Sequence, residues 1–328
     1  MVSQLKLSGV YHLKLNKYDD IHAWSVVGLY PAVMLACYSG DIGKSMIFQP
    51  STPLISIIVA VYNAKATMQQ CIDSVTHQTY PNKELIIIDG GSTDGTLALL
   101  EENHNKFSYW VSEPDCGIYN AWNKGLAQAK GEWICFLGAD DYFWDTTVLE
   151  RMAVKLELLP ENIRVAYGQI MLIDLDGQPP RSKGEPWEKI KDQFKQFMCI
   201  PHVGTMHRRS LFDQHGNFDE SFRIAGDYEF LLRELTTGDA SFIPDIVTAG
   251  QHLGGISTGK GNYLRTLREV ARAQRVHGKL LPARYVLKEM KKECLRLLLW
   301  KVLGDGLARK LLDKRRRIKG LPPYWTKE

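Results

Sequence analysis

The strongest constraint on the fold is a set of three apolar stretches, each followed by small or polar residues. Leu54–Tyr62 is rich in β-branched residues, Glu84–Asp89 contains Leu-Ile-Ile-Ile, and Trp133–Leu137 is entirely apolar. Continuous apolar runs of this length are typical of strands that are buried on both faces of a parallel sheet. The chain is therefore predicted to form an α/β fold with these strands at its centre.

Helical patterns separate these strands. Apolar residues recur with helical spacing after the first strand, at Met68, Cys71, Ile72 and Val75. Further helices are predicted at 96–104 and 118–129, with a short strand at 107–111 between them. Strands that alternate with helices over short connections indicate a doubly wound, mostly parallel sheet.

The chain on either side of this core is less regular. A pair of strands is expected between residues 23 and 38. After residue 141 we predict a helix at 146–158 and a strand at 165–173. An irregular aromatic segment at 187–205 is expected to shape a pocket. The remaining predicted elements are helices at 208–214 and 226–235, an extended segment at 243–249 and helices from 263 onward.

The charge of the chain is unevenly distributed. The net charge is +4, but residues 281–328 hold 14 Lys/Arg and five Asp/Glu, which gives +9 there and leaves −5 for the rest. Leucines share one face of the helix predicted in this tail, and cations surround it. Such a helix suits an anionic membrane surface, and it equally suits a helix that packs its leucines on the protein. Nucleic-acid binding has little support, because the basic run is confined to the tail.

Two observations concern the compartment. The six cysteines are scattered and include no Cys-x-x-Cys pair, which is typical of reduced, mostly buried thiols in the cytoplasm. No signal peptide opens the chain, and no run of 18 apolar residues could span a membrane. We therefore expect a cytoplasmic protein, which would contact the inner face of the plasma membrane peripherally if its tail binds lipid.

Two adjacent carboxylates, Asp140 and Asp141, follow the strand at 133–137. Oxygen ligands at the end of a strand suit Mg²⁺ or Mn²⁺, which also bind substrate phosphates. The pair could instead cap the next helix, and a bare Asp-Asp taken alone favours that interpretation. Both roles stay open on these residues.

Asp89 ends a second buried strand. It is either a turn residue or an acceptor of hydrogen bonds from a base or ribose at the edge of the sheet. The turn after it is rich in glycine and includes Gly91, where backbone N–H groups could approach a phosphate or base.

Asp227 is the third candidate carboxylate. It lies at the predicted start of a helix, where it would cap the helix or act as a general base that faces a pocket. The histidines lack the spacing of a zinc site, and no G-x-S-x-G nucleophile motif is present.

The order of these motifs is more specific than any one of them. The segments that carry it are Pro53–Ala64, Cys71–Asn82, Glu84–Thr96, Ser112–Gly125, Phe136–Asp141 and Phe218–Arg233. Together they resemble family-2 glycosyltransferases of the GT-A fold, and the fourth is similar to the subgroup that builds bacterial surface polysaccharides. The resemblance covers roughly residues 54–258.

The resemblance implies a role for each matching residue. The residues that would bind the nucleotide-sugar are Ala60, Tyr62, Asn63, Asp89, Gly91, Asp115, Asn123, Lys124 and Asp140. Asp140 and Asp141 would hold a divalent metal, Mn²⁺ or Mg²⁺, that bridges the diphosphate. Asp227 would deprotonate the acceptor hydroxyl in a single displacement that inverts the anomeric centre. The chain departs from the family at Gly138, where the DxD motif usually begins with an acid.

The implied function is transfer of one hexosyl or N-acetylhexosaminyl group from a nucleotide-diphosphate sugar, with a UDP-sugar as the expected donor. The acceptor would be a saccharide or a polyprenyl-diphosphate-linked saccharide in bacterial exopolysaccharide, capsule or O-antigen synthesis. The processive branch is disfavoured, since a Q-x-x-R-W motif is absent.

Two alternative functions compete with sugar transfer. One is a non-catalytic GT-A-like module that binds nucleotide or glycan in an assembly complex. The other, a sugar-phosphate nucleotidyltransferase, needs a glycine-rich loop that Val61–Lys65 does not supply.

The predicted organisation has three parts. They are an N-terminal extension of unclear role at 1–53, a GT-A domain at 54–260 with a nucleotide-sugar half (54–141) and an acceptor half (142–260), and a basic helical extension at 261–328.

Overall fold

The structure, a computed structural model, describes residues 24–27, 34–37, 52–174, 179–254, 262–318, 320 and 326. Within them, the main sheet contains nine strands in the order β5-β4-β3-β6-β10-β8-β11-β7, and β9 pairs with β8. The strands are β3 (Ile55–Val61), β4 (Lys83–Asp89), β5 (Tyr109–Ser112), β6 (Trp133–Gly138), β7 (Tyr142–Phe143), β8 (Val165–Ile173), β9 (Arg181–Lys183), β10 (Met206–Arg208) and β11 (Ser241–His252).

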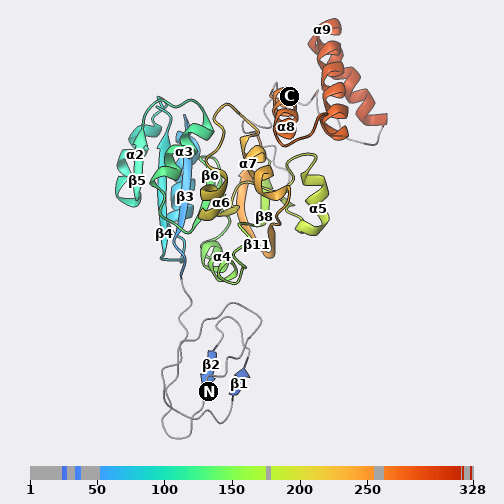
Figure 1. Ribbon diagram of the computed structural model, residues 1–328. Helices are drawn as coiled ribbons and strands as arrows, with labels where there is room; N and C mark the ends of the chain where they lie inside the picture. Colours follow the sequence, from blue (N-terminus) through green and yellow to red (C-terminus); the bar gives the residue numbers. More distant parts are fainter. Residues whose placement is uncertain are drawn as a thin grey trace.

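Helices connect and cover these strands (Figure 1). They are α1 (Lys65–Thr76), α2 (Thr96–Glu102), α3 (Ile118–Gln128), α4 (Val148–Glu157), α5 (Trp187–Phe194), α6 (Arg209–His215), α7 (Gly226–Leu235), α8 (Tyr263–Val276) and α9 (Arg284–Ile318), with a 3₁₀ turn at His104–Lys106. In Figure 1, α2 and β5 lie at one end of the sheet, and α9 extends away from the sheet beyond α8.

The strands predicted from the apolar runs form the parallel centre of the sheet. β5, β4, β3 and β6 are parallel neighbours, in register so that Ala60 lies opposite both Ile88 and Gly138. β10 is antiparallel between β6 and β8, whereas β11 is parallel to β8. The prediction of a mostly parallel α/β sheet flanked by helices is therefore confirmed, and the C-terminal ends of β3, β4, β5 and β6 share one edge.

The two faces of the sheet have separate hydrophobic cores, because side chains of a strand alternate between faces. Ile57 contributes to a core with α1, α2 and α4. Its neighbour Ile58 contributes to the opposite core, which is built from residues of α3 and α5 to α8. All strands at the centre are thus buried on both sides, as their composition predicts.

The segment at 187–205, which was expected to be irregular, is irregular only after residue 194. Residues 187–194 form α5, whose buried side chains Trp187, Ile190 and Phe194 follow helical spacing. Each of the short strands β7, β9 and β10 was also missed, because two or three residues carry too little pattern to identify a strand.

The terminal regions are described only in part. β1 (Trp24–Val27) and β2 (Met34–Cys37) form an antiparallel pair, as expected, and the other residues up to 51 lie outside the described residues. At the other end, α9 is interrupted at Gly304, whose backbone is not helical. In the described parts of the chain, no helix is both long enough and apolar enough to span a bilayer. Cys71, Cys116, Cys135, Cys199 and Cys294 are free thiols.

Candidate active site

The first part of the site is the turn after β4. Asp89 is fully buried, and its carboxylate accepts hydrogen bonds from the backbone N–H groups of Gly91 (3.2 Å) and Ser92 (3.0 Å), from the Ser92 hydroxyl and from the Ser112 hydroxyl (2.6 Å). Gly91 adopts a positive φ of 83°, which favours glycine. Asp89 therefore holds the turn after β4 against the end of β5.

The end of β3 is joined to the same turn through Asn63. Its backbone N–H donates to the Ser92 hydroxyl at 2.8 Å, and its side-chain oxygen accepts the Thr93 N–H at 2.8 Å. Asn63 has a φ of 50°, a left-handed conformation that Asn tolerates better than most residues. Tyr62 beside it is 65% exposed, so its ring is available to a ligand.

Asp115 belongs to this group as well. Its Oδ1 accepts the Gly117 N–H at 2.8 Å, and its Oδ2 lies 2.6 Å from the point that a Cβ of residue 90 would occupy. The ring of Tyr62 is 3.4 Å from the same point. The missing side chain of Gly90 thus leaves space in which Tyr62 and Asp115 converge.

Asp140 and Asp141 form the second part of the site, at the end of β6. A Cβ on Gly138 would lie 2.7 Å from Asp141 Oδ2 and 2.8 Å from Asp140 Oδ1. Both carboxylates therefore fold over residue 138. A side chain at that position, such as the acid of the usual motif, would require the two carboxylates to shift, whereas Gly138 leaves them in place.

Neither carboxylate caps the next helix. Thr147, the residue before α4, makes no side-chain cap hydrogen bond, and its own N–H donates to Asp145 Oδ1 at 2.8 Å. Asp141 Oδ2 accepts the Gly138 N–H at 3.3 Å, and the carbonyl of Asp140 accepts a hydrogen bond from His252 at 2.5 Å. The capping interpretation of the Asp-Asp pair is therefore wrong.

Asp141 is incompletely satisfied. Its side chain is buried, and Oδ1 has no hydrogen-bond partner. Burial, and secondarily the charge of Asp140, raises the pKa of the Asp141 carboxyl to about 7. A buried acceptor without a partner is costly, and a cation would satisfy it.

These two carboxylates fit a divalent metal of the kind that the fold family implies. Asp141 Oδ1, which has no hydrogen-bond partner, and the carboxylate oxygens that lie over Gly138 are possible ligands for the ion. The described residues contain no cluster of three or more His, Cys, Asp or Glu that could enclose an ion. Mg²⁺ and Mn²⁺ suit such a site, since they commonly use one or two carboxylates together with substrate phosphates.

Asp227 forms the third part, in the first turn of α7. Its Oδ1 accepts the Tyr228 N–H at 2.8 Å and the Tyr119 hydroxyl at 3.3 Å. The same hydroxyl accepts the Gly226 N–H at 2.8 Å. Tyr119 lies in the first turn of α3, which follows β5, so α7 begins at the edge where the parallel strands end.

The side chain of Asp227 is half-buried, and burial raises the pKa of its carboxyl to about 6. Nearby Lys183 on β9 acts weakly in the opposite direction. A carboxylate with a pKa close to neutrality is suited to accept a proton at physiological pH.

Asn123 and Lys124 are engaged within the protein. Asn123 exchanges hydrogen bonds with the backbone of Phe218 and donates to Glu220. Lys124 forms an ion pair with Glu113 at 2.7 Å. They connect α3 to the loop between α6 and α7 and to the loop after β5, and their roles near the diphosphate or sugar stay predictions.

Residues that were not predicted from the sequence also support the site. Tyr119 fixes Asp227, and a ring contact of 5.4 Å joins it to Trp122, which packs on Phe136 at 4.8 Å. His202 stacks on Trp122 at 4.9 Å. Tyr119 lies within a segment that carries the family resemblance, but its contact with a residue 108 positions away could not be read from the sequence.

The sequence is similar to those of known glycosyltransferases. The sequence model described as Glycosyl transferase family 2 matches residues 56–215. A PGL/p-HBAD biosynthesis glycosyltransferase of Mycobacterium bovis is 31% identical over 211 residues, which cover 62% of this chain and 75% of that protein. The chain belongs to glycosyltransferase family 2. It is accordingly a transferase, in agreement with the resemblance carried by its motifs.

Solved structures share the fold of this family-2 glycosyltransferase. S. aureus TarS 1–349 in complex with UDP-GlcNAc has a TM-score of 0.53 at 19% identity, over 72% of this chain and 71% of that one. The mannosyltransferase PcManGT from Pyrobaculum calidifontis, in complex with GDP-Man and Mn²⁺, has a TM-score of 0.53 at 18% identity, over 84% of both chains. The chain spans 42% of the longer TarS structure. The GT-A fold is thereby confirmed.

Proposed function

We propose that the protein is an inverting glycosyltransferase that moves one sugar from a nucleotide-diphosphate sugar to a saccharide or polyprenyl-diphosphate-linked acceptor, with a hexosyl or N-acetylhexosaminyl group as cargo. Bacterial exopolysaccharide, capsule or O-antigen synthesis would use such a product. Two of the solved structures that share the fold are complexes with UDP-GlcNAc and with GDP-Man, which supports a nucleotide-sugar donor.

The donor would lie along the edge formed by β3, β4 and β6. The exposed ring of Tyr62 offers a stacking surface for a base, and Asp115 beside it offers a carboxylate to the sugar or ribose. Ala60 and the turn held by Asp89, with Gly91, would form the floor of this pocket. UDP is our preferred nucleotide.

Asp140 and Asp141 would hold Mn²⁺ or Mg²⁺ against the diphosphate. A metal bound there would neutralise the charge of the leaving nucleoside diphosphate. The protein contributes the two carboxylates over Gly138, and the His252 contact with the Asp140 carbonyl that fixes their loop.

Asp227 would act as the general base. In the proposed step the acceptor oxygen forms a bond to the anomeric carbon, its proton moves to the Asp227 carboxylate, and the bond to the diphosphate oxygen breaks with its electron pair leaving on the nucleoside diphosphate. Attack from the face opposite the leaving group inverts the configuration. Tyr119 orients the carboxylate for this role.

The observation that carries the proposal is the half-buried Asp227 carboxylate, whose pKa is raised to about 6. Asp227→Asn keeps the size and removes the base, so we expect transfer to fall by about 10²- to 10⁴-fold while nucleotide-sugar binding is retained. Donor binding would be followed by thermal shift with UDP-GlcNAc, UDP-glucose and GDP-mannose, and turnover by release of the nucleoside diphosphate with Mn²⁺. Wild-type turnover in this variant would remove the assignment, and retention of the donor's anomeric configuration in the product would exclude inversion.

The basic C-terminal helix supports a second part of the proposal, peripheral contact with an anionic membrane at the inner face of the plasma membrane. Several apolar side chains of α9 are exposed, namely Leu287, Leu295, Leu297, Leu298, Val302, Leu303, Leu307, Leu311 and Ile318. The helix ends in the run Lys314-Arg-Arg-Arg317. Exposed leucines among cations match a lipid surface, where each nearby cation contributes about 1 kcal/mol.

Vesicle sedimentation tests this contact. The full chain should co-sediment with vesicles rich in phosphatidylserine and much less with neutral phosphatidylcholine vesicles. Leu298→Ser/Val302→Ser should weaken binding without changing net charge. Equal binding of a chain that lacks residues 304–328 to anionic vesicles would contradict a role for the end of the tail.

A further inference from the structure

Helix α8, from the part of the chain beyond the predicted GT-A domain, makes an unusual contact with the segment before α7. Glu269 Oε2 accepts three consecutive backbone N–H groups, those of Arg223 (3.0 Å), Ile224 (2.8 Å) and Ala225 (3.0 Å). Hydrogen bonds to an ionised carboxylate are stronger than neutral ones. A single side-chain oxygen thus fixes the backbone of three residues.

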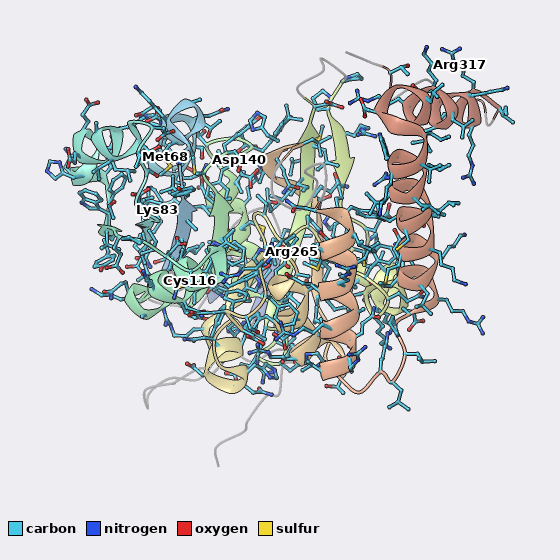
Figure 2. The ribbon with its side chains drawn as sticks, turned by 90° about the horizontal axis from the view of Figure 1, so that it is seen from above. Met68, Lys83, Cys116, Asp140, Arg265 and Arg317 are labelled. Carbon is cyan, nitrogen blue, oxygen red and sulfur yellow. The ribbon has the colours of Figure 1, made fainter. Side chains whose placement is uncertain are left out.

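The two oxygens of Glu269 have separate partners. Oε2 takes the three N–H groups, whereas Oε1 lies 3.4 Å from the guanidinium of Arg265, one turn earlier on α8. The side chain of Glu269 is only 12% exposed, whereas that of Arg265 is 56% exposed. Figure 2 labels Arg265, which marks α8, and Asp140, which marks the loop after β6. The loop contact can therefore be separated experimentally from the ion pair.

The fixed segment leads directly into Gly226 and Asp227. Gly226 has no room for a side chain, since a Cβ there would lie 2.7 to 2.9 Å from atoms of the Tyr119 ring. Glu269 binds the N–H groups of the three residues that immediately precede α7, which begins at Gly226. Asp227 is thus anchored from two sides, by Tyr119 of α3 and, through the preceding backbone, by Glu269 of α8.

Other contacts keep α8 in place on α7 and the adjoining loop. The guanidinium of Arg272 lies over the Phe222 ring at 4.1 Å and donates to the Ser221 carbonyl at 3.2 Å. His277, just after α8, bonds to Glu229 of α7 at 3.0 Å. Because α8 is held by these independent contacts, removal of the Glu269 carboxylate should release the segment 223–225 without displacing the helix.

We propose that Glu269 is a positioning residue for the catalytic carboxylate, holding the Arg223–Ala225 backbone so that Asp227 faces the acceptor. This inference rests on the role of Asp227 in the proposed function. It makes α8 part of the machinery that sets the geometry of the base, although Glu269 itself touches no substrate. A shift of the base by about 1 Å is enough to slow a reaction on the order of 100-fold.

The test compares Glu269→Ala with Arg265→Ala, which removes the partner of Oε1 and leaves the three N–H contacts. Hydrogen exchange of the 223–225 amides needs no ligand, and in Glu269→Ala it should become at least about tenfold faster because those N–H groups lose their acceptor. With UDP-GlcNAc, UDP-glucose or GDP-mannose and Mn²⁺, kcat for nucleoside diphosphate release should fall about 10- to 100-fold, with the donor KM within about twofold of wild type. Arg265→Ala should match wild type in all three measurements.

Glu269→Gln, which keeps the volume, provides a milder variant if Glu269→Ala folds poorly, and it should show smaller changes in the same direction. Unchanged exchange of the 223–225 amides would show that Glu269 does not hold this backbone segment. Faster exchange with wild-type kcat, or an increase in donor KM alone, would overturn the positioning role. Failure of the proposed function is recognised separately, because Asp227→Asn would then turn over like wild type.

Discussion

The carboxylate of Asp89, after β4, and those of Asp141 and Asp227, after β6 and at the start of α7, differ in how completely they are hydrogen-bonded. Asp89 accepts four hydrogen bonds from its own turn and from β5. Asp141 has an oxygen without a partner, and burial raises the pKa of both Asp141 and Asp227, to about 7 and about 6. A fully bonded carboxylate maintains the shape of a pocket, whereas a buried one with spare capacity is suited to a ligand or a proton.

This difference assigns separate tasks to residues that look alike in the sequence. All three are aspartates that follow a strand or begin a helix. We expect changes at Asp89 to act chiefly on stability, and changes at Asp141 and Asp227 to act chiefly on turnover.

The largest effect is expected from removal of both carboxylates over Gly138. Asp140→Ala/Asp141→Ala should reduce nucleoside diphosphate release with Mn²⁺ on the order of 10³-fold, because several kcal/mol of charge stabilisation at the leaving group are lost. Unfolding by urea should show a folded protein, since a buried carboxylate without full partners contributes little to stability. Unchanged Mn²⁺-dependent turnover would contradict the metal assignment, and it would favour a site that acts without these acids.

Asp89→Asn should have the opposite profile. An amide has one acceptor oxygen and places an NH₂ group against the donors that Asp89 now satisfies, so the free energy of unfolding should fall by about 3 kcal/mol. Ser112→Ala removes only one of the four donors and should cost about 1 kcal/mol. Urea titration measures both. If Asp89→Asn were as stable as wild type but inactive, Asp89 would be a ligand-binding residue first and a turn residue second.

Gly138→Ala should have a smaller effect on the same loop. The added Cβ would press on both carboxylates, and Mn²⁺ affinity should fall about tenfold, the size expected when the groups that orient a ligand are disturbed. Gly306→Ala is a matched control, because a Cβ there meets nothing within 4 Å. Isothermal titration with Mn²⁺ in the presence of UDP would compare the two variants. Equal affinities would show that the loop adapts to a side chain at 138.

The sequence predicted the centre of this fold because its physical signal is local. β3, β4, β6 and β8 are apolar runs, and α7 was placed at the residues where it begins and ends. The prediction of an irregular segment is wrong for α5, because a cluster of aromatic residues also suits a pocket, whereas Trp187, Ile190 and Phe194 follow helical spacing. β10, which is three residues long, becomes a strand only because β6 and β8 supply partners on both sides.

The candidate site was predictable only in part. Asp140, Asp141 and Asp227 were selected from their places at element ends and from the family resemblance. The reason for Gly138 was not accessible, because it depends on two side chains that fold back over the residue. The roles of Tyr119 and Glu269 are also missing from the sequence prediction, since each contacts a segment that is distant in sequence. Tyr119 is 108 residues from Asp227, and Glu269 is up to 46 residues from the 223–225 backbone that it binds.

The pH dependence of kcat/KM for nucleoside diphosphate release tests the central claim most directly. Asp227 must be ionised to accept a proton, and its pKa is raised to about 6. At Mn²⁺ concentrations that keep the Asp140–Asp141 site occupied, so that Asp141 stays ionised, activity should fall about tenfold per pH unit below about 6 and level off above it. The residual activity of Asp227→Asn should lack this limb. A wild-type profile that is flat from pH 5 to 7, or the same limb in the variant, would contradict Asp227 as the base.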